Sequence, residues 1–171
     1  MRFFSKKSLL ISGLLLLAIA CFGQVKSGAY RAMLYTLLSH TVPETGVKEA
    51  AELHRNGAIF LDAREPREFE VSRIPGAVPV GYDHFDLRNL PDTIQKDRPV
   101  VVYCSVGYRS EKVAEKLKKA GFTRVSNLYG GIFEWVNQGY AVVDATGATQ
   151  NVHAYDRTWG VWLKKGRKVY K

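Results

Sequence analysis

Residues 100–110 read VVVYCSVGYRS, and this stretch decides the fold. Its first four residues are β-branched or aromatic, which is typical of a strand covered on both faces in a parallel sheet. A short loop follows, and the apolar spacing beyond it predicts a helix over residues 110–120 that ends at Gly121. Strand, short loop and helix in this order direct backbone N–H groups toward one point at the carboxyl end of the strand. Cys104 occupies that point.

The rest of the chain alternates short strands with helices. Residues 64–70 are expected to be helical in part, and one or two helical turns are expected over 86–90. This order predicts an α/β domain with a mainly parallel central sheet flanked by helices on both faces. The other expected elements are helices over 27–39, 47–56 and 132–138, and strands over 59–61, 78–80 and 125–128.

Length and charge limit the classes of function. The 171 residues are enough for one ordinary domain, and the formal net charge is +9. Residues 1–21 carry +3 and residues 146–171 carry +5, whereas residues 22–145 hold 16 basic and 15 acidic side chains. The middle of the chain is nearly neutral, so the sequence does not predict a basic nucleic-acid-binding domain.

The N-terminus has the pattern of a targeting signal. Three cations within the first seven residues precede an apolar run over 9–22, and Ala18-Ile19-Ala20 fits the small-x-small rule for cleavage before Cys21. We expect residues 1–23 to be a signal peptide, a lipoprotein signal with Cys21 lipidated, or an uncleaved membrane anchor. These expectations place the protein in the bacterial periplasm or envelope. A buried N-terminal helix is the alternative.

The loop after Cys104 has the residues that a nucleophile needs. A thiolate there is stabilised by the facing N–H groups, by the helix N-terminus and by the Arg109 cation. Gly107 allows a tight backbone curl, and Ser110 is expected to cap the helix and to offer a hydroxyl hydrogen bond to sulfur. The alternative is a buried structural cysteine with Arg109 on the surface.

Three segments carry a resemblance to a known family. Residues 104–110 (CSVGYRS) resemble the active loop of rhodanese-family sulfurtransferases. Residues 61–77, with LDAREPREF followed by IPGA, resemble the first signature of that family, and residues 128–135 (LYGGIFEW) resemble its last. The resemblance implies one rhodanese-like domain over 42–144, and the residue pattern predicts a helical segment over 24–41 before it. One departure is Ser72-Arg73, where the family commonly has Gly-His.

The resemblance implies a chemistry. Cys104 takes the outer sulfur of thiosulfate or another sulfane donor as a persulfide, and passes it to a thiol or to cyanide. No metal or organic cofactor is implied. Asp62 and Arg64 are implied to buttress the site, although a surface ion pair is an equal interpretation. The residues implied to bind substrate are Ser105, Val106, Gly107, Tyr108, Arg109 and Ser110.

Two other activities are alternatives to this chemistry. Cysteine phosphatases of related folds place arginine six positions after cysteine, but here Arg109 is fifth and Ser110 sixth, so phosphatase activity is not expected. A persulfide carrier that does not turn over, or a redox-sensing interaction domain, stays open.

The C-terminal residues 145–171 form a basic, aromatic extension. Trp159, Val161 and Leu163 alternate in the manner of a strand, which predicts a hairpin that turns at residues 164–167. Packing of Trp159 and Trp162 against a sheet edge or the early helix is one interpretation. A contact surface for an anionic membrane or a partner protein is the other.

Overall fold

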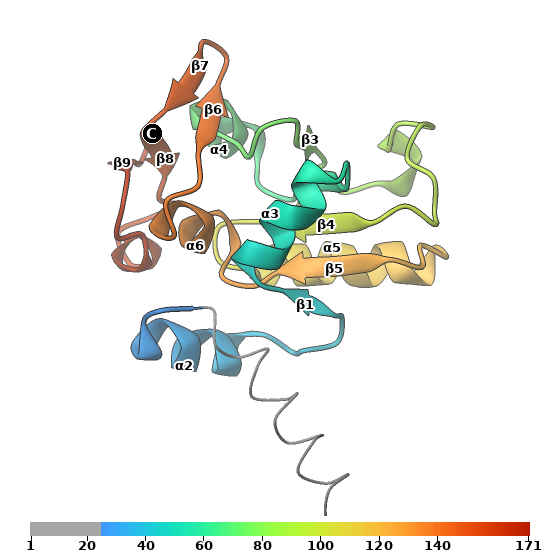
Figure 1. The fold of residues 1–171 in the computed structure, drawn as a ribbon, viewed down its shortest axis with the longest axis horizontal. Helices are drawn as coiled ribbons and strands as arrows, with labels where there is room; N and C mark the ends of the chain where they lie inside the picture. The colour runs from blue at the N-terminus through green and yellow to red at the C-terminus, as the bar shows by residue number, and fades with distance from the viewer. Residues whose placement is uncertain (1–24) are drawn as a thin grey trace, which may run out of the picture.

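The computed structural model describes residues 25–171, and a five-stranded sheet lies at its centre (Figure 1). The strand order is β1–β5–β4–β2–β3, and every neighbouring pair is parallel. The predicted α/β fold with a mainly parallel sheet is confirmed. The strands are β1 (Glu44–Thr45), β2 (Ile59–Asp62), β3 (Val78–Pro79), β4 (Val100–Tyr103) and β5 (Val125–Leu128).

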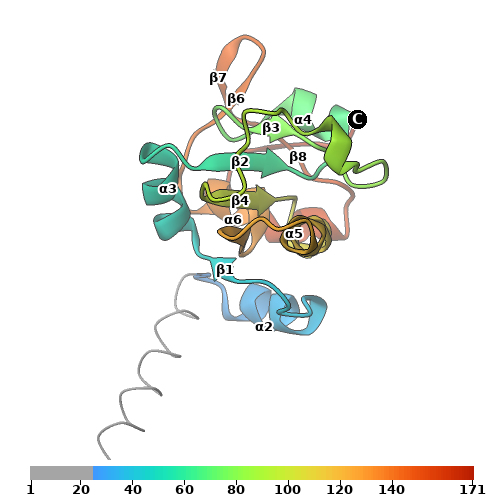
Figure 2. The same cartoon turned by 90° about the vertical axis from the view of Figure 1, so that its right-hand side faces the viewer.

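Helices cover both faces of this sheet. Figures 1 and 2 show α3 (Val47–Arg55) and α5 (Tyr108–Lys119) on opposite faces, and α2 (Gly28–Leu37) beside the β1 edge. Two short helices, α4 (Pro66–Val71) and α6 (Gly131–Asn137), follow β2 and β5 in the chain. The predicted helices are therefore present, with their ends shifted by one or two residues. The polar segment after β3 contains one 3-10 turn, η1 (Leu87–Asn89).

Strand β4 divides the core into two layers, because successive side chains point to opposite faces. Val101 and Tyr103 pack in the layer that also holds residues of α2, α3 and α6. Val100, Val102 and Cys104 pack in the layer that holds the apolar face of α5. Burial of each such valine stabilises the fold by about 1.5–3 kcal/mol, which explains the unbroken apolar run of β4.

The C-terminal extension differs from the predicted hairpin. A hairpin does occur, but it is made of β6 (Val142–Asp144) and β7 (Gly147–Thr149). Beyond it, β8 (Asn151–His153) pairs in parallel with β9 (Arg167–Val169). The intervening chain contains a 3-10 turn, η2 (Trp159–Trp162), so the strand-like alternation there was misleading.

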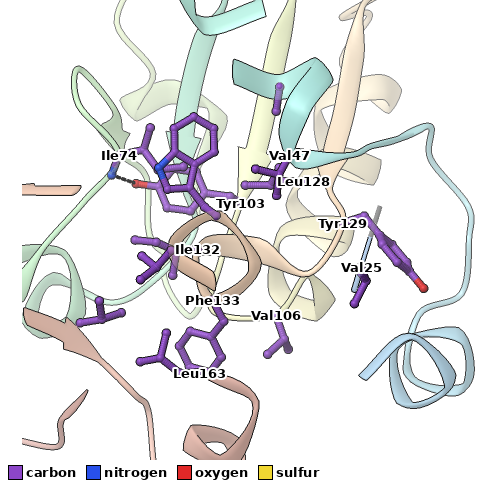
Figure 3. Packing of buried hydrophobic residues seen from close by; sticks show 14 of the residues in the cluster. Val25, Val47, Ile74, Tyr103, Val106, Leu128, Tyr129, Ile132, Phe133 and Leu163 are labelled. Atoms are coloured by element: carbon purple, nitrogen blue, oxygen red, sulfur yellow. Dashed lines mark hydrogen bonds between the residues drawn. The ribbon is translucent and has the colours of Figure 1, made fainter. Parts of the chain in front are cut away.

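This extension packs on the domain. The Trp162 ring stacks on Tyr30 of α2 with the ring centroids 5.1 Å apart and 11° between the planes. Leu163 is fully buried, and Figure 3 shows it beside Phe133 of α6. The packing interpretation is therefore confirmed for Trp162, with the early helix as the surface that it covers.

The predicted export segment, including Cys21, lies outside the described residues. Across residues 25–171, no helix has the length and apolar character needed to cross a membrane.

Candidate active site

Cys104 lies directly after β4, where the loop curls back over its sulfur. The backbone N–H of Gly107 donates to Cys104 Sγ at 3.1 Å. Gly107 has a φ of +124°, a conformation that L side chains rarely adopt, so glycine is what permits this curl. One of the N–H groups predicted to face the cysteine, that of Gly107, does so, and Cys104 itself is only 1% exposed.

The start of α6 holds the carbonyl groups of the same loop. Ile132 N–H donates to the carbonyl oxygen of Cys104 at 2.9 Å, and Phe133 N–H donates to that of Ser105 at 3.1 Å. These carbonyl groups are thereby directed to α6 rather than to the sulfur. Gly131 lies so close to both oxygens that a Cβ at its position would stand 2.6 Å from the oxygen of Ser105. Gly131 of the last signature thus permits close contact between α6 and the backbone of the loop.

Ser110 has a different structural role from the one predicted. Helix α5 begins at Tyr108, two residues earlier than expected, with Gly107 at the N-cap and no side chain capping the helix. The Ser110 hydroxyl donates to Asn127 Oδ1 at 2.7 Å, not to sulfur, and Asn127 Nδ2 donates to the carbonyl oxygen of Gly107 at 3.0 Å. The expectations of a capping Ser110 and of a Ser110–sulfur bond are therefore wrong. Asn127 on β5 was missed.

Arg109 is held by Glu68 of α4. Arg109 Nη1 lies 2.7 Å from Glu68 Oε2 and Nη2 lies 2.8 Å from Oε1, while Nη2 also donates to Ser105 Oγ at 3.1 Å. Ser105 Oγ donates in turn to Glu68 Oε1 at 3.0 Å. Burial acts to raise the pKa of Glu68, but the Arg109 hydrogen bonds and charge outweigh it and lower that pKa. The triangle fixes Arg109 as a cation beside Cys104.

Asp62 and Arg64 form a buried ion pair, with Arg64 Nη2 2.6 Å from Asp62 Oδ2 and both side chains fully enclosed. The surface ion-pair interpretation is therefore wrong. Arg64 also donates to the carbonyl oxygen of Ser72 at 2.6 Å, and Ala63 N–H donates to Tyr103 O at 2.8 Å. These contacts secure the residues after β2 to the strand end that carries Cys104. Arg64 contacts the backbone of Ser72 and not its side chain. The presence of Ser72-Arg73 in place of the family's usual Gly-His therefore leaves this contact intact.

A cavity of ≈ 370 Å³ opens over Cys104. Of the residues predicted to bind substrate, Ser105, Val106, Tyr108 and Arg109 line it, whereas Gly107 and Ser110 shape the loop without lining it. No cluster of His, Cys, Asp or Glu suited to a metal ion occurs within residues 25–171. The full lining is Leu37, Glu65, Arg67, Tyr82, Asp83, Cys104, Ser105, Val106, Tyr108, Arg109, Tyr155 and Trp159.

A comparison with known protein families identifies the domain that carries this site. Residues 47–138 match the rhodanese-like domain family. The chain belongs to this family. The match contains the whole curled loop, β2 with its buried ion pair, and the start of α6.

Individual relatives agree with that assignment. A sulfurtransferase of Allochromatium vinosum is 36% identical over 89 residues, which are 52% of this chain and 81% of the relative. A tRNA uridine(34) hydroxylase of Listeria welshimeri is 41% identical over 80 residues, but the match covers only 24% of it. The solved thiosulfate sulfurtransferase of Pseudomonas aeruginosa is 26% identical with a TM-score of 0.55; the match covers 60% of this chain and 20% of that one.

Part of the cavity comes from outside the rhodanese-like match. Leu37 of α2 precedes the match, and Tyr155 and Trp159 follow it, yet all three line the cavity. Sequence reasoning missed them because their approach to Cys104 depends on how two flanking segments pack. The exposed cation Arg67, on α4, was missed as well. Its signal was its place within the first family signature, directly before Glu68.

Proposed function

We propose that this chain is a sulfurtransferase that moves sulfane sulfur from thiosulfate or a persulfide donor to a thiol or cyanide acceptor through Cys104. The observation that carries the proposal is the Gly107 N–H at 3.1 Å from Cys104 Sγ, at the floor of a cavity that admits a small molecule. An N–H group aimed at sulfur stabilises an anion there, both as thiolate and as persulfide.

The proposed reaction has two half-steps. The Cys104 thiolate attacks the outer sulfur of thiosulfate, a new S–S bond forms on Cys104, and the bond to the central sulfur breaks with release of sulfite and its electron pair. An acceptor thiolate or cyanide then attacks the outer sulfur of the persulfide. The Cys104 thiolate leaves and is regenerated. The result is ping-pong covalent catalysis with no net redox change.

The residues around Cys104 have separate parts in this proposal. The loop N–H groups stabilise the terminal sulfur of the persulfide, and Arg109, held in place by Glu68, adds a fixed positive charge. Asp62 and Arg64 are positioning residues, since they do not line the cavity.

The test is thiosulfate:cyanide sulfur transfer by the purified full chain, beside Cys104→Ala, with intact mass recorded after thiosulfate treatment. Thiocyanate turnover that is absent from the variant, with one sulfur gained by the wild type, supports the proposal. One sulfur gained without turnover identifies a carrier that waits for a specific acceptor. Absence of both the sulfur adduct and thiocyanate turnover contradicts the use of thiosulfate.

We also propose that the N-terminal residues direct the protein to the bacterial envelope. The support is the basic start, the apolar run and the small residues before Cys21. Fractionation of cells that make the full chain, beside a Cys21→Ala variant, tests this. Envelope location that survives in Cys21→Ala excludes lipidation as the means of attachment, and cytoplasmic wild type contradicts export.

A further inference from the structure

The C-terminal extension is fixed to the domain rather than attached loosely. Asn137 Nδ2 of α6 donates to the carbonyl oxygen of Trp162 at 2.9 Å, and Leu163 is fully buried in the core. Trp162 stacks on Tyr30, so the extension and α2 support one another. The chain from the end of β8 through η2 therefore has a defined place over the site.

This segment delivers two aromatic rings to the cavity above Cys104. Tyr155 and Trp159 both line it. Tyr155 has a φ of +65°, which is uncommon for a residue with a side chain, and its N–H donates to His153 Nδ1 at 3.1 Å. Its ring lies 5.1 Å from the guanidinium carbon of Arg109. A strained backbone that holds a ring beside the site is the kind of outlier that accompanies function.

The cavity is larger and more apolar than a sulfur oxyanion requires. Its volume of ≈ 370 Å³ lies in the range of about 300–1,000 Å³ that is usual for organic ligands. A small inorganic ion at Cys104 would leave much of that space to water, against Leu37, Tyr155 and Trp159. Rings and aliphatic groups contribute binding energy only when an apolar group covers them.

We propose that Tyr155 and Trp159 are specificity-determining residues for a sulfane-sulfur donor that carries a flat apolar carbon group, such as an aryl thiosulfonate or an aromatic persulfide. The sulfane end reaches Cys104, and the carbon group lies against the two rings. This inference rests on the sulfurtransferase function proposed above and names the class of donor.

The loading step balances for such a donor. The Cys104 thiolate attacks the outer sulfur of a thiosulfonate anion, the bond between the outer and the sulfonyl sulfur breaks, and a sulfinate leaves with the electron pair. Cys104 retains one sulfur as persulfide. No oxidant, reductant or metal takes part.

The experiment compares benzenethiosulfonate with methanethiosulfonate as donors to the full chain, with cyanide as acceptor. The test variant is Tyr155→Asn with Trp159→Leu, because asparagine tolerates the positive φ and leucine keeps apolar volume. The control is Tyr35→Ala, which removes an exposed ring that does not line the cavity. For each protein the ratio of kcat/KM for the aryl donor to that for the methyl donor is measured. Comparing this ratio between variant and wild type cancels the intrinsic difference between the two leaving groups.

We expect the double variant to lower the kcat/KM ratio of aryl to methyl donor roughly three- to tenfold, as loss of aromatic contacts predicts. The methyl donor should react within about a factor of three of wild type, which shows that the variant is folded, and Tyr35→Ala should leave the ratio unchanged. An unchanged ratio in a double variant that reacts with both donors overturns this inference and leaves the sulfurtransferase proposal standing. Absence of a persulfide with every donor overturns both.

Discussion

Arg109 and Glu68 meet through two parallel hydrogen bonds of 2.7 and 2.8 Å, so the positive charge beside Cys104 is shared with a fully buried carboxylate. The pair joins the start of α5, directly after the loop at Cys104, to α4, and the two residues are 41 positions apart in sequence. A bidentate pair fixes the plane of the guanidinium as well as its position. Arg109 is thus oriented toward the loop before any donor arrives.

Replacement of Glu68 by glutamine should destabilise the protein and slow persulfide formation. The change leaves the partly buried Arg109 charge without its partner, which typically costs about 3 kcal/mol in the free energy of unfolding. Misplacement of Arg109 and Ser105 should lower the rate of persulfide formation by roughly 10- to 100-fold. Thermal unfolding and the rate of sulfite release measure the two effects. Glu70→Gln, an exposed change on the same helix, is the control.

The same pair predicts a pH dependence of stability. Because the fold lowers the pKa of Glu68 from its ordinary 4.5, the carboxylate stabilises the protein fully above that value. This contribution is lost as the pH falls from 4.5 through the lowered pKa. The difference in melting temperature between wild type and Glu68→Gln should therefore be constant near neutral pH and shrink below about pH 4.5. A difference that stays constant into strong acid would contradict the assignment.

Arg67→Gln should weaken the binding of thiosulfate. Arg67 is exposed, lines the cavity and forms no ion pair within residues 25–171, so its charge is open to an anionic donor. We expect KM for thiosulfate to rise several-fold, kcat to change little, and the effect to fade at high salt. Arg55→Gln on α3 removes an exposed charge that does not line the cavity and should leave KM unaltered. Equal effects of both variants would refute a local role.

Gly131→Ala should disrupt the loop after Cys104 from the side of α6. The added Cβ would press on the carbonyl oxygens of Cys104 and Ser105, which are backbone atoms that cannot turn aside. Overpacking of this kind costs roughly 3 kcal/mol in the free energy of unfolding. Denaturant unfolding of the variant measures it. Gly28→Ala, where a Cβ meets nothing within 4 Å, is the matched control, and equal stability of the two variants would show that the loop can yield.

The sequence predicted the elements whose signals are local. Strand β4, the cysteine at its end and the curl at Gly107 all follow from one short stretch, because backbone conformation and strand burial leave a local pattern. Glu68 and Asn127 carry no such signal of their role, since they reach the loop from other elements. The hairpin predicted for the C-terminal extension was wrong for a related reason. The alternation at residues 159–163 suggested a strand, but the chain forms a 3-10 turn over Trp159–Trp162, with Trp162 stacked on Tyr30 and the following Leu163 buried in the core.

Asn127 and Ser110 should act as one unit in shaping the loop. Asn127 is fully buried, accepts from the Ser110 hydroxyl at 2.7 Å and donates to the carbonyl oxygen of Gly107 at 3.0 Å. Asn127→Ala should lower the free energy of unfolding by about 2 kcal/mol, because two buried hydrogen bonds to the loop are lost. It should also slow persulfide formation, since the N–H of Gly107 loses its fixed aim at Cys104.

A double-mutant cycle of Asn127→Ala and Ser110→Ala separates this unit from two independent contacts. Once Asn127 is replaced, loss of the Ser110 hydroxyl should cost less than it does in the wild type, with a coupling of about 1 kcal/mol. Unfolding free energies of the four proteins give the coupling, and Ser126→Ala, on the same strand, controls for strand perturbation. Additive effects would mean that each side chain stabilises the fold separately.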